Sequence, residues 1–351
     1  MKILYGVQAT GNGHISRSRE VIKALKSLGH EVLVVFSGRE EEKLKAGGIS
    51  EFEPFRIFQG LTFVTEKGKV QYLKTAASLN FYKFYKDIFL FKREDFDLVV
   101  TDFEPVVSRV AKRWKIPCIG VGHQYAFCFD IPKADSNILS WPAFLVTKYF
   151  ARADISLGLH WYHFNQPILP PIIPKYLKNS EKVIENKILV YLAFEEPREV
   201  AKMLEPLTDY DFFLYRSGNE LKDEGHLHFR TFSREGFLND LEECSGVICN
   251  AGFELPSEAL HLGKKLLVRP LSGQVEQFSN ALALEKLKLG QIMINLESEC
   301  VKAWLDSPLP PRMNYPDVAQ AIAEWIGEGK WNKMDSLIEK TWSKIDLKYF
   351  E

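Results

Sequence analysis

Short apolar runs alternate with longer amphipathic stretches through the first half of the chain. Apolar runs too short for helices predict buried strands at 2–7, 31–36, 97–101 and 118–121. Apolar positions at helical spacing predict helices at 15–28 and 105–114. Strands that alternate with helices in this way are typical of a parallel sheet covered by helices on both faces.

A cluster of prolines interrupts this alternation near the middle of the chain. Four of them fall within eight residues, at Pro167, Pro170, Pro171 and Pro174. This density favours a stiff extended connection over a helix or a central strand. We therefore predict a linker at 166–180.

The alternation restarts beyond the linker. Apolar runs predict strands at 187–194, 211–215, 226–231, 246–250 and 265–270. Amphipathic stretches predict helices at 198–207, 237–243 and 276–287, and one that ends near 262. The pattern predicts an α/β fold with two parallel-sheet domains, 1–165 and 181–330. Ligands bind beyond the carboxyl ends of strands in such sheets, so we expect the chemistry in the loops that follow strands.

Composition narrows the class of protein. The 351 residues are 46% hydrophobic and 26% charged, which are ordinary proportions for a globular protein and exclude wholesale disorder and collagen. Lys and Arg number 45 against 46 Asp and Glu, so the chain lacks the basic excess of a dedicated nucleic-acid binder. We therefore expect no nucleic-acid partner.

Cysteines and apolar runs bear on the compartment. The five cysteines include no Cys-x-x-Cys pair, which favours a reducing environment. The first residues resemble a strand more than a signal peptide, and no run reaches the ~20 apolar residues needed to span a bilayer. We expect a cytoplasmic protein, and peripheral contact with a membrane stays open.

The loop after the first predicted strand, Thr10-Gly11-Asn12-Gly13-His14, is the first candidate for chemistry. Gly11 and Gly13 allow a tight turn and a close approach to a ligand. The loop has neither the Gly-x-Gly-x-x-Gly pattern nor a Gly-Lys-Ser/Thr ending, which argues against dinucleotide or P-loop binding. His14 is suited to general-base catalysis near neutral pH. The alternative is a histidine held at the helix start by backbone hydrogen bonds.

Two further strands end at titratable residues on the same predicted rim. Asp102 is placed to reach His14 and fix its tautomer. The more frequent role for such a residue is to cap the helix that starts at Pro105. Glu104 is expected to be a solvated or first-turn acid. His123 is expected near the same cleft, where the favoured interpretation is a loop histidine bonded to the backbone.

Polar loops also follow two strands of the second half. The loop from Asn250 leads into a helix with Pro256 in its first turn, and the free amides of that turn suit a diphosphate. Glu258 is placed to accept hydrogen bonds from ribose hydroxyls, unless it only complements the helix dipole. Glu276 and Gln277 offer the acceptors and donors that match vicinal hydroxyls of a sugar, unless they form only a polar first turn.

These two loops resemble the donor-binding half of GT-B glycosyltransferases, in the superfamily of UDP-glycosyltransferases and the lipid II N-acetylglucosaminyltransferase. The resemblance rests on the segment from Asn250 to Glu258, on Glu276-Gln277 followed by Asn280-Ala281, and on the Gly-x-Gly-His ending at His14. It implies two Rossmann-like domains facing across a cleft. It also implies transfer of a sugar from a nucleotide-diphosphate sugar, expected to be UDP-linked, to an acceptor hydroxyl, with inversion and with no metal or other cofactor.

The resemblance assigns roles residue by residue. His14 would deprotonate the acceptor and Asp102 would orient His14. The residues that would contact the donor are Asn250, Gly252, Phe253, Ser257, Glu258, Glu276, Gln277 and Asn280. Further candidates for the cleft are Gly11, Gly13, His123 and Arg216. The sequence departs from the plant enzymes, which carry His, Asn and Ser where this chain has Asn250, Glu254 and Leu255.

Charged residues bear on how an anionic donor is held. Glu195 and Glu196 follow a predicted strand on the donor side. The cations that can offset them are Arg216, Lys264, Lys265 and Arg269. Two Asp-x-Asp triplets begin at Asp95 and Asp209, but they precede strands, which is the wrong end of a sheet for a metal–diphosphate site. We therefore predict no metal site.

Two other segments bear on the acceptor and on the domain arrangement. The stretch 72–93 mixes aromatic residues with Lys and Arg. Aromatics at 81, 84, 85 and 89 have helical spacing, which favours a helix packed in the core with its lysines outside. The alternative is a helix that lies on a membrane surface or binds a lipid acceptor. The stretch 331–349 is expected to be a helix that crosses back to the N-terminal domain.

The identity of the acceptor, a lipid or a glycan, is not encoded in a recognisable motif. Two other functions fit the same architecture. One is a nucleotide-sugar epimerase, which needs no acceptor and predicts several carboxylates near the sugar. The other is a non-catalytic nucleotide-sugar-binding protein, which the departure at Asn250 keeps open.

Overall fold

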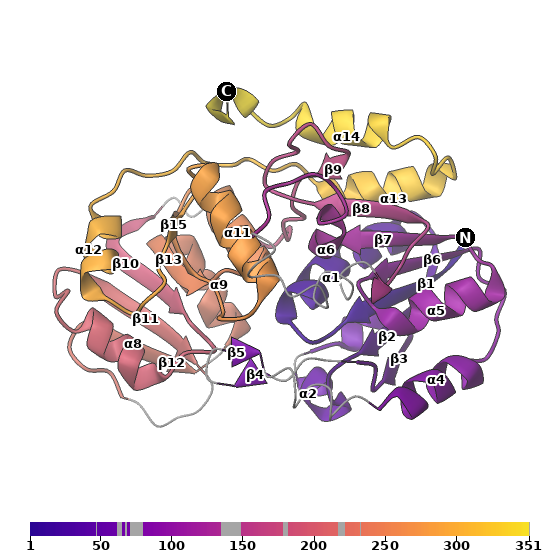
Figure 1. The fold of residues 1–351 in the computed structure, drawn as a ribbon, viewed down its shortest axis with the longest axis horizontal. Coiled ribbons are helices and arrows are strands. Elements are labelled where there is room, and N and C mark those ends of the chain that lie inside the picture. Colours follow the sequence, from indigo (N-terminus) through magenta and orange to yellow (C-terminus); the bar gives the residue numbers. More distant parts are fainter. Residues whose placement is uncertain are drawn as a thin grey trace.

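The computed structural model describes residues 1–46, 48–61, 65–66, 69–70, 80–134, 149–177, 182–216, 222–231 and 233–350. Two α/β units lie side by side, one built mainly from the first half of the chain and the other from the second half (Figure 1). The prediction of two units, each with a parallel sheet, is confirmed.

The N-terminal unit holds a seven-stranded sheet with the order β3-β2-β1-β6-β7-β8-β9, in which every pair is parallel. Its strands are β1 (Lys2–Gln8), β2 (Glu31–Ser37), β3 (Phe55–Phe58), β6 (Leu98–Asp102), β7 (Cys118–Gly122), β8 (Ile155–Leu159) and β9 (Ile168–Leu169). Its helices are α1 (Asn12–Ser27), α2 (Glu41–Ala46), α4 (Phe81–Leu90), α5 (Pro105–Trp114) and α6 (His123–Ala126), with a 3-10 turn, η1, at Ser50–Phe52. A separate antiparallel pair is formed by β4 (Thr65–Glu66) and β5 (Lys69–Val70).

The C-terminal unit repeats this topology with six parallel strands in the order β12-β11-β10-β13-β14-β15. The strands are β10 (Ile184–Tyr191), β11 (Asp211–Arg216), β12 (Leu227–Thr231), β13 (Cys244–Asn250), β14 (Lys265–Arg269) and β15 (Gln291–Ile292). The helices are α8 (Pro197–Leu204), α9 (Arg234–Glu243), α10 (Glu254–His261), α11 (Val275–Lys286) and α12 (Ser298–Leu305). In both units the strand order reverses beside the first strand, which is where doubly wound sheets bind ligands.

Most predicted elements lie within a few residues of the observed ones, but the strands β3, β4, β5, β8, β9 and β15 and the helices α2, α6 and α12 were not predicted. The strand β9 lies inside the range predicted for the linker and pairs with β8. The prolines that follow, Pro170, Pro171 and Pro174, are buried and not exposed. The connection between the units is therefore packed against protein along part of its length.

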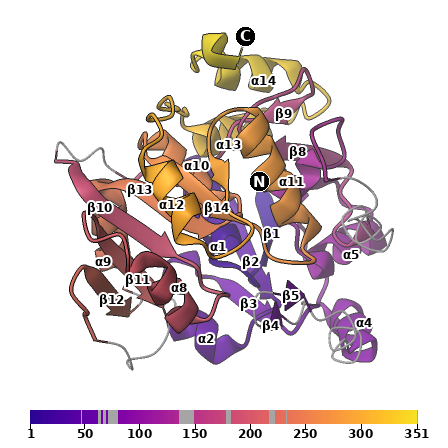
Figure 2. The same ribbon diagram turned by 60° about the vertical axis from the view of Figure 1, so that its left-hand side comes forward.

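The end of the chain returns to the N-terminal unit, as predicted, but it does so earlier than expected. Helix α13 (Val318–Glu328) already packs on α1, and α14 (Asp335–Trp342) follows it before a last 3-10 turn, η2 (Leu347–Phe350). The Trp342 indole donates to the Ile168 carbonyl of β9 at 2.6 Å. Figures 1 and 2 both show α13 and α14 on the side of the N-terminal unit where β8 and β9 lie.

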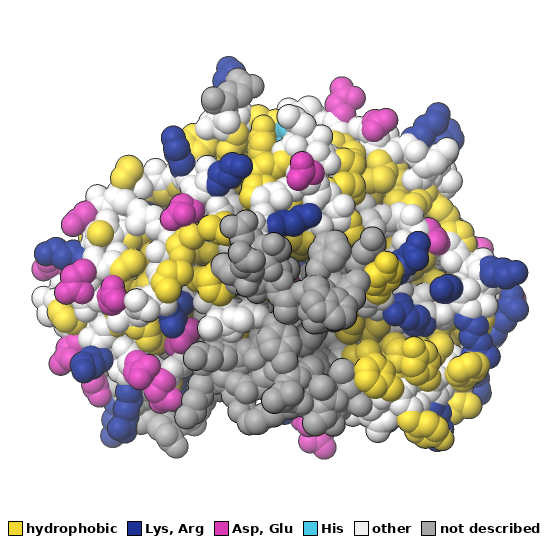
Figure 3. Space-filling view, viewed as in Figure 1, with side chains coloured by type: hydrophobic (Ala, Val, Ile, Leu, Met, Phe, Trp, Pro, Cys, Tyr) yellow, Lys and Arg dark blue, Asp and Glu magenta, His cyan; other side chains and the backbone are white. Residues whose placement is uncertain are grey.

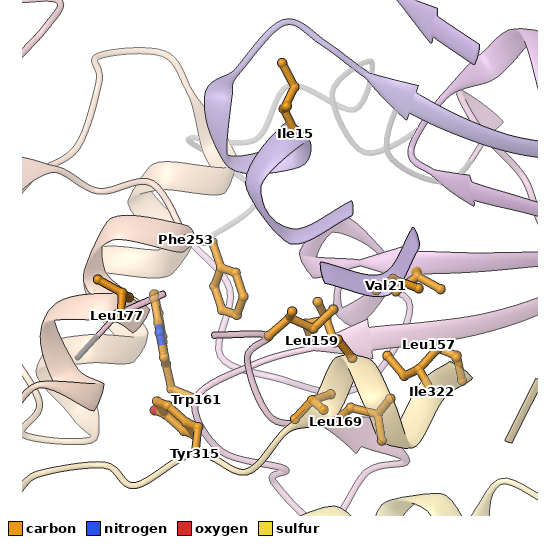
Figure 4. Close-up of a cluster of buried hydrophobic side chains, with 14 of the residues drawn as sticks. Ile15, Val21, Leu157, Leu159, Trp161, Leu169, Leu177, Phe253, Tyr315 and Ile322 are labelled. Atoms are coloured by element: carbon orange, nitrogen blue, oxygen red, sulfur yellow. The ribbon is translucent and has the colours of Figure 1, made fainter. Parts of the chain in front are cut away.

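The two units share a buried aromatic contact. Trp161, after β8, packs against Phe253, before α10, with ring centroids 5.0 Å apart, and its indole donates to Ser257 at 2.8 Å. Figure 4 shows these rings beside Leu177 and Tyr315. Because all of these side chains are buried, the units meet through a close-packed interface.

Within the described parts of the chain, no helix combines the length and the apolar character needed to cross a bilayer.

Candidate active site

A pocket of about 540 Å³ lies between the two units. It is lined by the loops that follow β1, β10 and β13, so it opens at the point in each sheet where the strand order reverses. Of the predicted site residues, those that line it are Gly11, Gly13, His14, Asn250, Gly252, Phe253, Glu258, Glu276 and Gln277. The expectation that the strand-end loops meet in one cleft is therefore met.

His14 lies in the first turn of α1, because that helix begins at Asn12 and not at Ile15 as predicted. Asp102 is the last residue of β6, the strand beside β1. The two side chains meet, with His14 Nδ1 2.8 Å from Asp102 Oδ1. An ionised carboxylate only accepts, so Nδ1 carries the proton in this contact and Nε2 keeps its lone pair.

Asp102 is fully buried and is surrounded by donors. The Arg17 guanidinium donates through Nε to Oδ2 at 2.8 Å, and the Ser18 hydroxyl donates to the same oxygen at 2.8 Å. Burial raises the pKa of Asp102, but Arg17 and His14 outweigh burial and hold the pKa below its ordinary value. Asp102 is therefore ionised at neutral pH and able to orient His14.

The helix after β6 is capped by Glu104 and not by Asp102. Glu104 accepts hydrogen bonds from the backbone amides of Val106 and Val107 at 2.8 and 2.7 Å. Of the two alternatives predicted for Glu104, a solvated or a first-turn acid, the solvated one is wrong, since Glu104 is fully buried at the helix start and also accepts from the Ser37 hydroxyl. Burial raises its pKa to about 7 against these hydrogen bonds. With the cap supplied by Glu104, Asp102 is left to bind His14.

Arg17 also joins the two units. Its Nη1 donates to Glu254 at the start of α10 at 2.6 Å, and only 3% of the Arg17 side chain is exposed. Its Nη2 lies 2.7 Å from His14 Nδ1. A guanidinium only donates, so a hydrogen bond from Arg17 needs a lone pair on Nδ1, whereas the hydrogen bond to Asp102 needs a proton there. Nδ1 therefore makes only one of these two hydrogen bonds at a time. Arg17 therefore connects the His14–Asp102 pair to α10 of the C-terminal unit.

Two other contacts close the pocket around this ion pair. Gln124 of α6 donates to Glu276 of α11 at 3.1 Å and accepts from Arg17. A Cβ atom at Gly13 would lie 2.5 Å from the Glu254 side chain, so this close approach requires glycine. Both contacts place residues of the C-terminal unit, the predicted Glu276 and the unpredicted Glu254, against the N-terminal unit.

Two buried carboxylates line the pocket. Burial raises the pKa of Glu254 to about 7, although Arg17 opposes the shift. Burial, with the charge of Glu254, raises the pKa of Glu258 to about 8, while Arg234 opposes the shift. A proton held by Glu258 at neutral pH reduces the negative charge that an anionic donor would meet.

Replacing Glu258 with glutamine is expected to change how stability depends on pH. The pKa of Glu258 is about 8 in the folded protein and 4.5 in the unfolded chain. The contribution of Glu258 to the free energy of unfolding is therefore fully present below about pH 4.5, and it is lost as the pH rises to about 8. In urea unfolding, the advantage of wild type over the variant should fall by up to about 1.4 kcal/mol per pH unit in this window. The same change at exposed Glu285 is the control, and equal pH slopes for the two variants would contradict the assignment.

Three predicted site residues are buried in the interface and do not line the pocket. Ser257 accepts from Trp161 and donates to the Phe253 carbonyl. His123 begins α6 and makes the expected backbone contact, with the Leu159 carbonyl at 2.8 Å, but it also contacts Asn280 at 2.6 Å and stacks on Phe253 at 4.0 Å. Ser257, His123 and Asn280 therefore hold the units together, and Asn280 also donates to Ala251.

The cations proposed from sequence do not gather at the pocket. Arg269 pairs with Glu195 at 2.9 Å, which neutralises that acid, while Lys264 and Lys265 lie at the opposite end of β14. Arg216 ends β11 outside the pocket lining. The arginines that do line the pocket are Arg17, Arg19, Arg39 and Arg234. Neither Asp-x-Asp triplet borders it.

Sequence reasoning missed Arg17 and underused Glu254. Arg17 stands three residues after His14, so helical spacing places both side chains on one face of α1, and that signal was available. Glu254 was noted only as a departure, because its partner lies 237 positions away in the sequence.

Comparison with known proteins identifies the family of the chain and supports its fold. A family profile described as glycosyl transferase family 1 matches residues 1–310, while no curated protein sequence matches the chain. Among solved structures, the chain is similar to the spinosyn rhamnosyltransferase SpnG complexed with thymidine diphosphate, at 13% identity over 97% of each chain and a TM-score of 0.60. It is similar to LpCGTa in complex with UDP, at 16% identity over 97% of this chain and 98% of the other, with a TM-score of 0.59. It is also similar to MurG of Acinetobacter baumannii, at 14% identity over 93% of this chain and 99% of the other, with a TM-score of 0.54.

Proposed function

Because the chain belongs to glycosyl transferase family 1, we propose that its interdomain pocket moves a sugar from a UDP-sugar to an acceptor hydroxyl with inversion. The observation that carries the proposal is the His14–Asp102 contact at the carboxyl ends of β1 and β6, across the pocket from the loop before α10. A glycosyltransferase with two Rossmann-like units needs an acceptor base and a donor site on facing edges, and these loops supply both.

His14 acts as the base in this proposal. Asp102 holds the proton on Nδ1, so Nε2 takes the acceptor proton as the acceptor oxygen attacks the anomeric carbon. One displacement of the nucleoside diphosphate inverts the anomeric centre. Asp102 is a positioning residue, because it acts through His14 and lies behind it.

The donor is held on the C-terminal side. The start of α10, after Gly252 and Phe253, lines the pocket, and the free backbone amides of a first helical turn suit the diphosphate. Glu258 is assigned to the ribose, and Glu276 and Gln277 to the transferred sugar. The complexes of LpCGTa with UDP and of SpnG with thymidine diphosphate support a pyrimidine nucleotide. No step needs a metal, since helix amides and the pocket arginines oppose the leaving charge.

Nucleotide binding is expected to stabilise the fold measurably. A ligand at a hundred times its dissociation constant adds about 2.7 kcal/mol to the free energy of unfolding, which corresponds to a rise of a few degrees in Tm. A thermal-shift panel should therefore respond to UDP and UDP-sugars more than to adenosine and guanosine diphosphates. Absence of a shift with every nucleotide would overturn the proposal.

The Glu276→Ala variant tests the sugar subsite separately. It is expected to weaken binding of the cognate UDP-sugar by about ten- to hundredfold, because a hydrogen bond between a charged carboxylate and the sugar is lost. Its affinity for UDP, which lacks the transferred sugar, should stay unchanged. Glu285→Gln, on the exposed face of the same helix, is the matched control. Equal losses for UDP and the UDP-sugar would place Glu276 elsewhere.

One observation favours epimerisation as a second candidate. Glu254, Glu258 and Glu276 all line the pocket, and an epimerase needs several carboxylates near the sugar. The two reactions are separated by incubating the donor without an acceptor. Epimerisation predicts a changed sugar on intact nucleotide, whereas transfer predicts free UDP only when an acceptor is added.

A further inference from the structure

Helix α4 carries an exposed aromatic stripe that the sequence pattern had assigned to the core. Phe81, Tyr85 and Phe89 are spaced four residues apart and are 52%, 52% and 65% exposed. Tyr82 and Leu90 are also exposed, at 80% and 67%. Because large apolar groups gathered on one surface mark an interaction site, the helix has a face suited to another apolar phase.

The inner side of α4 is occupied by different residues. Phe84 and Ile88 are buried against α5 in the same hydrophobic cluster as Val110. This burial fixes the rotation of the helix, and it turns the stripe of Phe81, Tyr85 and Phe89 outward. The prediction of packing therefore holds for Phe84 and is wrong for these three rings.

Neighbouring side chains hold the stripe in place. The Arg113 guanidinium of α5 lies 4.6 Å from the centre of the Phe89 ring and donates to the Ile88 and Phe89 carbonyls at 3.0 and 2.9 Å. At the other end, the Asn80 side chain caps α4 by accepting from the Lys83 amide. An ordered helix that presents rings outward loses little conformational entropy when it docks.

Basic residues flank the aromatic stripe. Lys83 and Lys86 are exposed on α4, and Lys92 and Arg93 follow it directly. By helical spacing, Lys86 lies next to the stripe, whereas Lys83 lies farther round the exposed side of the helix, beside Asp87. Figure 3 shows hydrophobic side chains and Lys or Arg side by side where Figure 1 places α4.

Charge is divided unevenly between the two halves of the chain. Residues 1–165 carry 23 Lys and Arg against 17 Asp and Glu, whereas residues 166–351 carry 22 against 29. The near-zero net charge of the whole chain therefore hides a positive half and a negative half. The aromatic helix belongs to the positive half, so an anionic surface would attract the half of the chain that contains α4 and repel the other half.

We propose that α4 docks the protein on an anionic lipid bilayer. In this arrangement Phe81, Tyr85 and Phe89 enter the boundary between headgroups and acyl chains, and the lysines lie level with the lipid phosphates. A bilayer is favoured over a protein partner because a lipid interface has an apolar layer that suits the aromatic rings and an anionic headgroup layer that suits the lysines. The proposal stands independently of the nucleotide donor.

Co-flotation of the full chain with vesicles tests the proposal. The protein should bind vesicles of phosphatidylcholine with phosphatidylglycerol, and bind pure phosphatidylcholine weakly. Phe81→Ser, Tyr85→Ser and Phe89→Ser together should lower binding at least about tenfold. Lys83→Gln with Lys86→Gln should lower it about fivefold per lysine at low salt and flatten the salt dependence.

The matched control replaces two exposed apolar residues of the other unit, Ile294→Ser and Leu309→Ser, which should leave binding unchanged. Thermal unfolding of each variant checks that the fold is retained, as the exposure of the changed side chains leads us to expect. Failure of wild type to bind anionic vesicles overturns the proposal. The proposal is also overturned if light scattering shows that wild type is a dimer and the triple variant a monomer, since α4 would then join two copies of this chain.

Discussion

Replacing His14 with alanine is expected to lower the rate of sugar transfer by roughly 10²- to 10⁴-fold while leaving the affinity for UDP unchanged. The rate falls because the acceptor hydroxyl loses the imidazole that takes its proton. Donor affinity is retained because the proposed donor contacts come from the C-terminal unit. Release of UDP in the presence of an acceptor that wild type uses gives the rate, and thermal shift with UDP gives the binding.

The chain offers a matched control for this experiment. His228 also contacts a carboxylate, with its Nε2 3.0 Å from Asp211, but this pair lies outside the pocket. His228→Ala should therefore leave transfer intact. Asp102→Asn should lower the rate and alter its pH profile, because the amide no longer enforces the tautomer with a free Nε2. If His14→Ala keeps full activity, His14 is not the base.

Replacing Arg17 with methionine is expected to cause the largest loss of stability, about 3–5 kcal/mol in the free energy of unfolding. The guanidinium contacts both Asp102 and Glu254, and removing it leaves two buried carboxylates without their cation. Arg17→Lys should recover little, because one ammonium group cannot bridge two carboxylates in the geometry of a guanidinium. Urea unfolding of the three proteins measures the effect.

A double-mutant cycle identifies the source of the loss. Glu254→Gln should be tolerated better in the Arg17→Met background than the single changes predict, because an amide needs no counterion. Arg39→Met is the control, since Arg39 also lines the pocket but donates to Asn12 and Thr10 instead of a carboxylate. Equal losses for Arg17→Met and Arg39→Met would show that lost packing, and not the ion pairs, accounts for the effect.

Hydrophobic periodicity was sufficient to predict the architecture. Buried strands such as β1 and β13 are short, mostly apolar runs. Helix α5 was predicted with its observed bounds because its apolar and charged residues lie on opposite faces. The missed strands β9 and β15 contain two residues each, too few to show a period. The start of α1 was missed because glycine and asparagine, and not apolar residues, form its first turn.

The site was predictable only where the position of a residue relative to the end of its strand determines where it lies. Loop positions after strands placed His14, Asp102 and Glu258 on the expected rim. The exchange of roles between Asp102 and Glu104 was not predictable, because both acids stand near the helix start and only side-chain direction separates them. The burial of Ser257 and Asn280 follows from contact between the units, which no local pattern contains.

Helix α4 shows the same limit in another form. Two stripes of this helix have helical spacing, one through Phe84 and Ile88 and one through Phe81, Tyr85 and Phe89. Both are apolar, so periodicity predicts the helix but does not select the buried face. The neighbouring α5 makes that selection by packing on Phe84 and Ile88.

The return of the chain to its first unit has a consequence for biosynthesis. A ribosome makes the N-terminal unit first, and domains generally fold as they emerge. Here the contacts of α1 with α13 and of the edge strand β9 with Trp342 cannot form until the C-terminal unit has been translated. The C-terminal unit can thus complete its sheet before α13 and Trp342 cover the N-terminal unit.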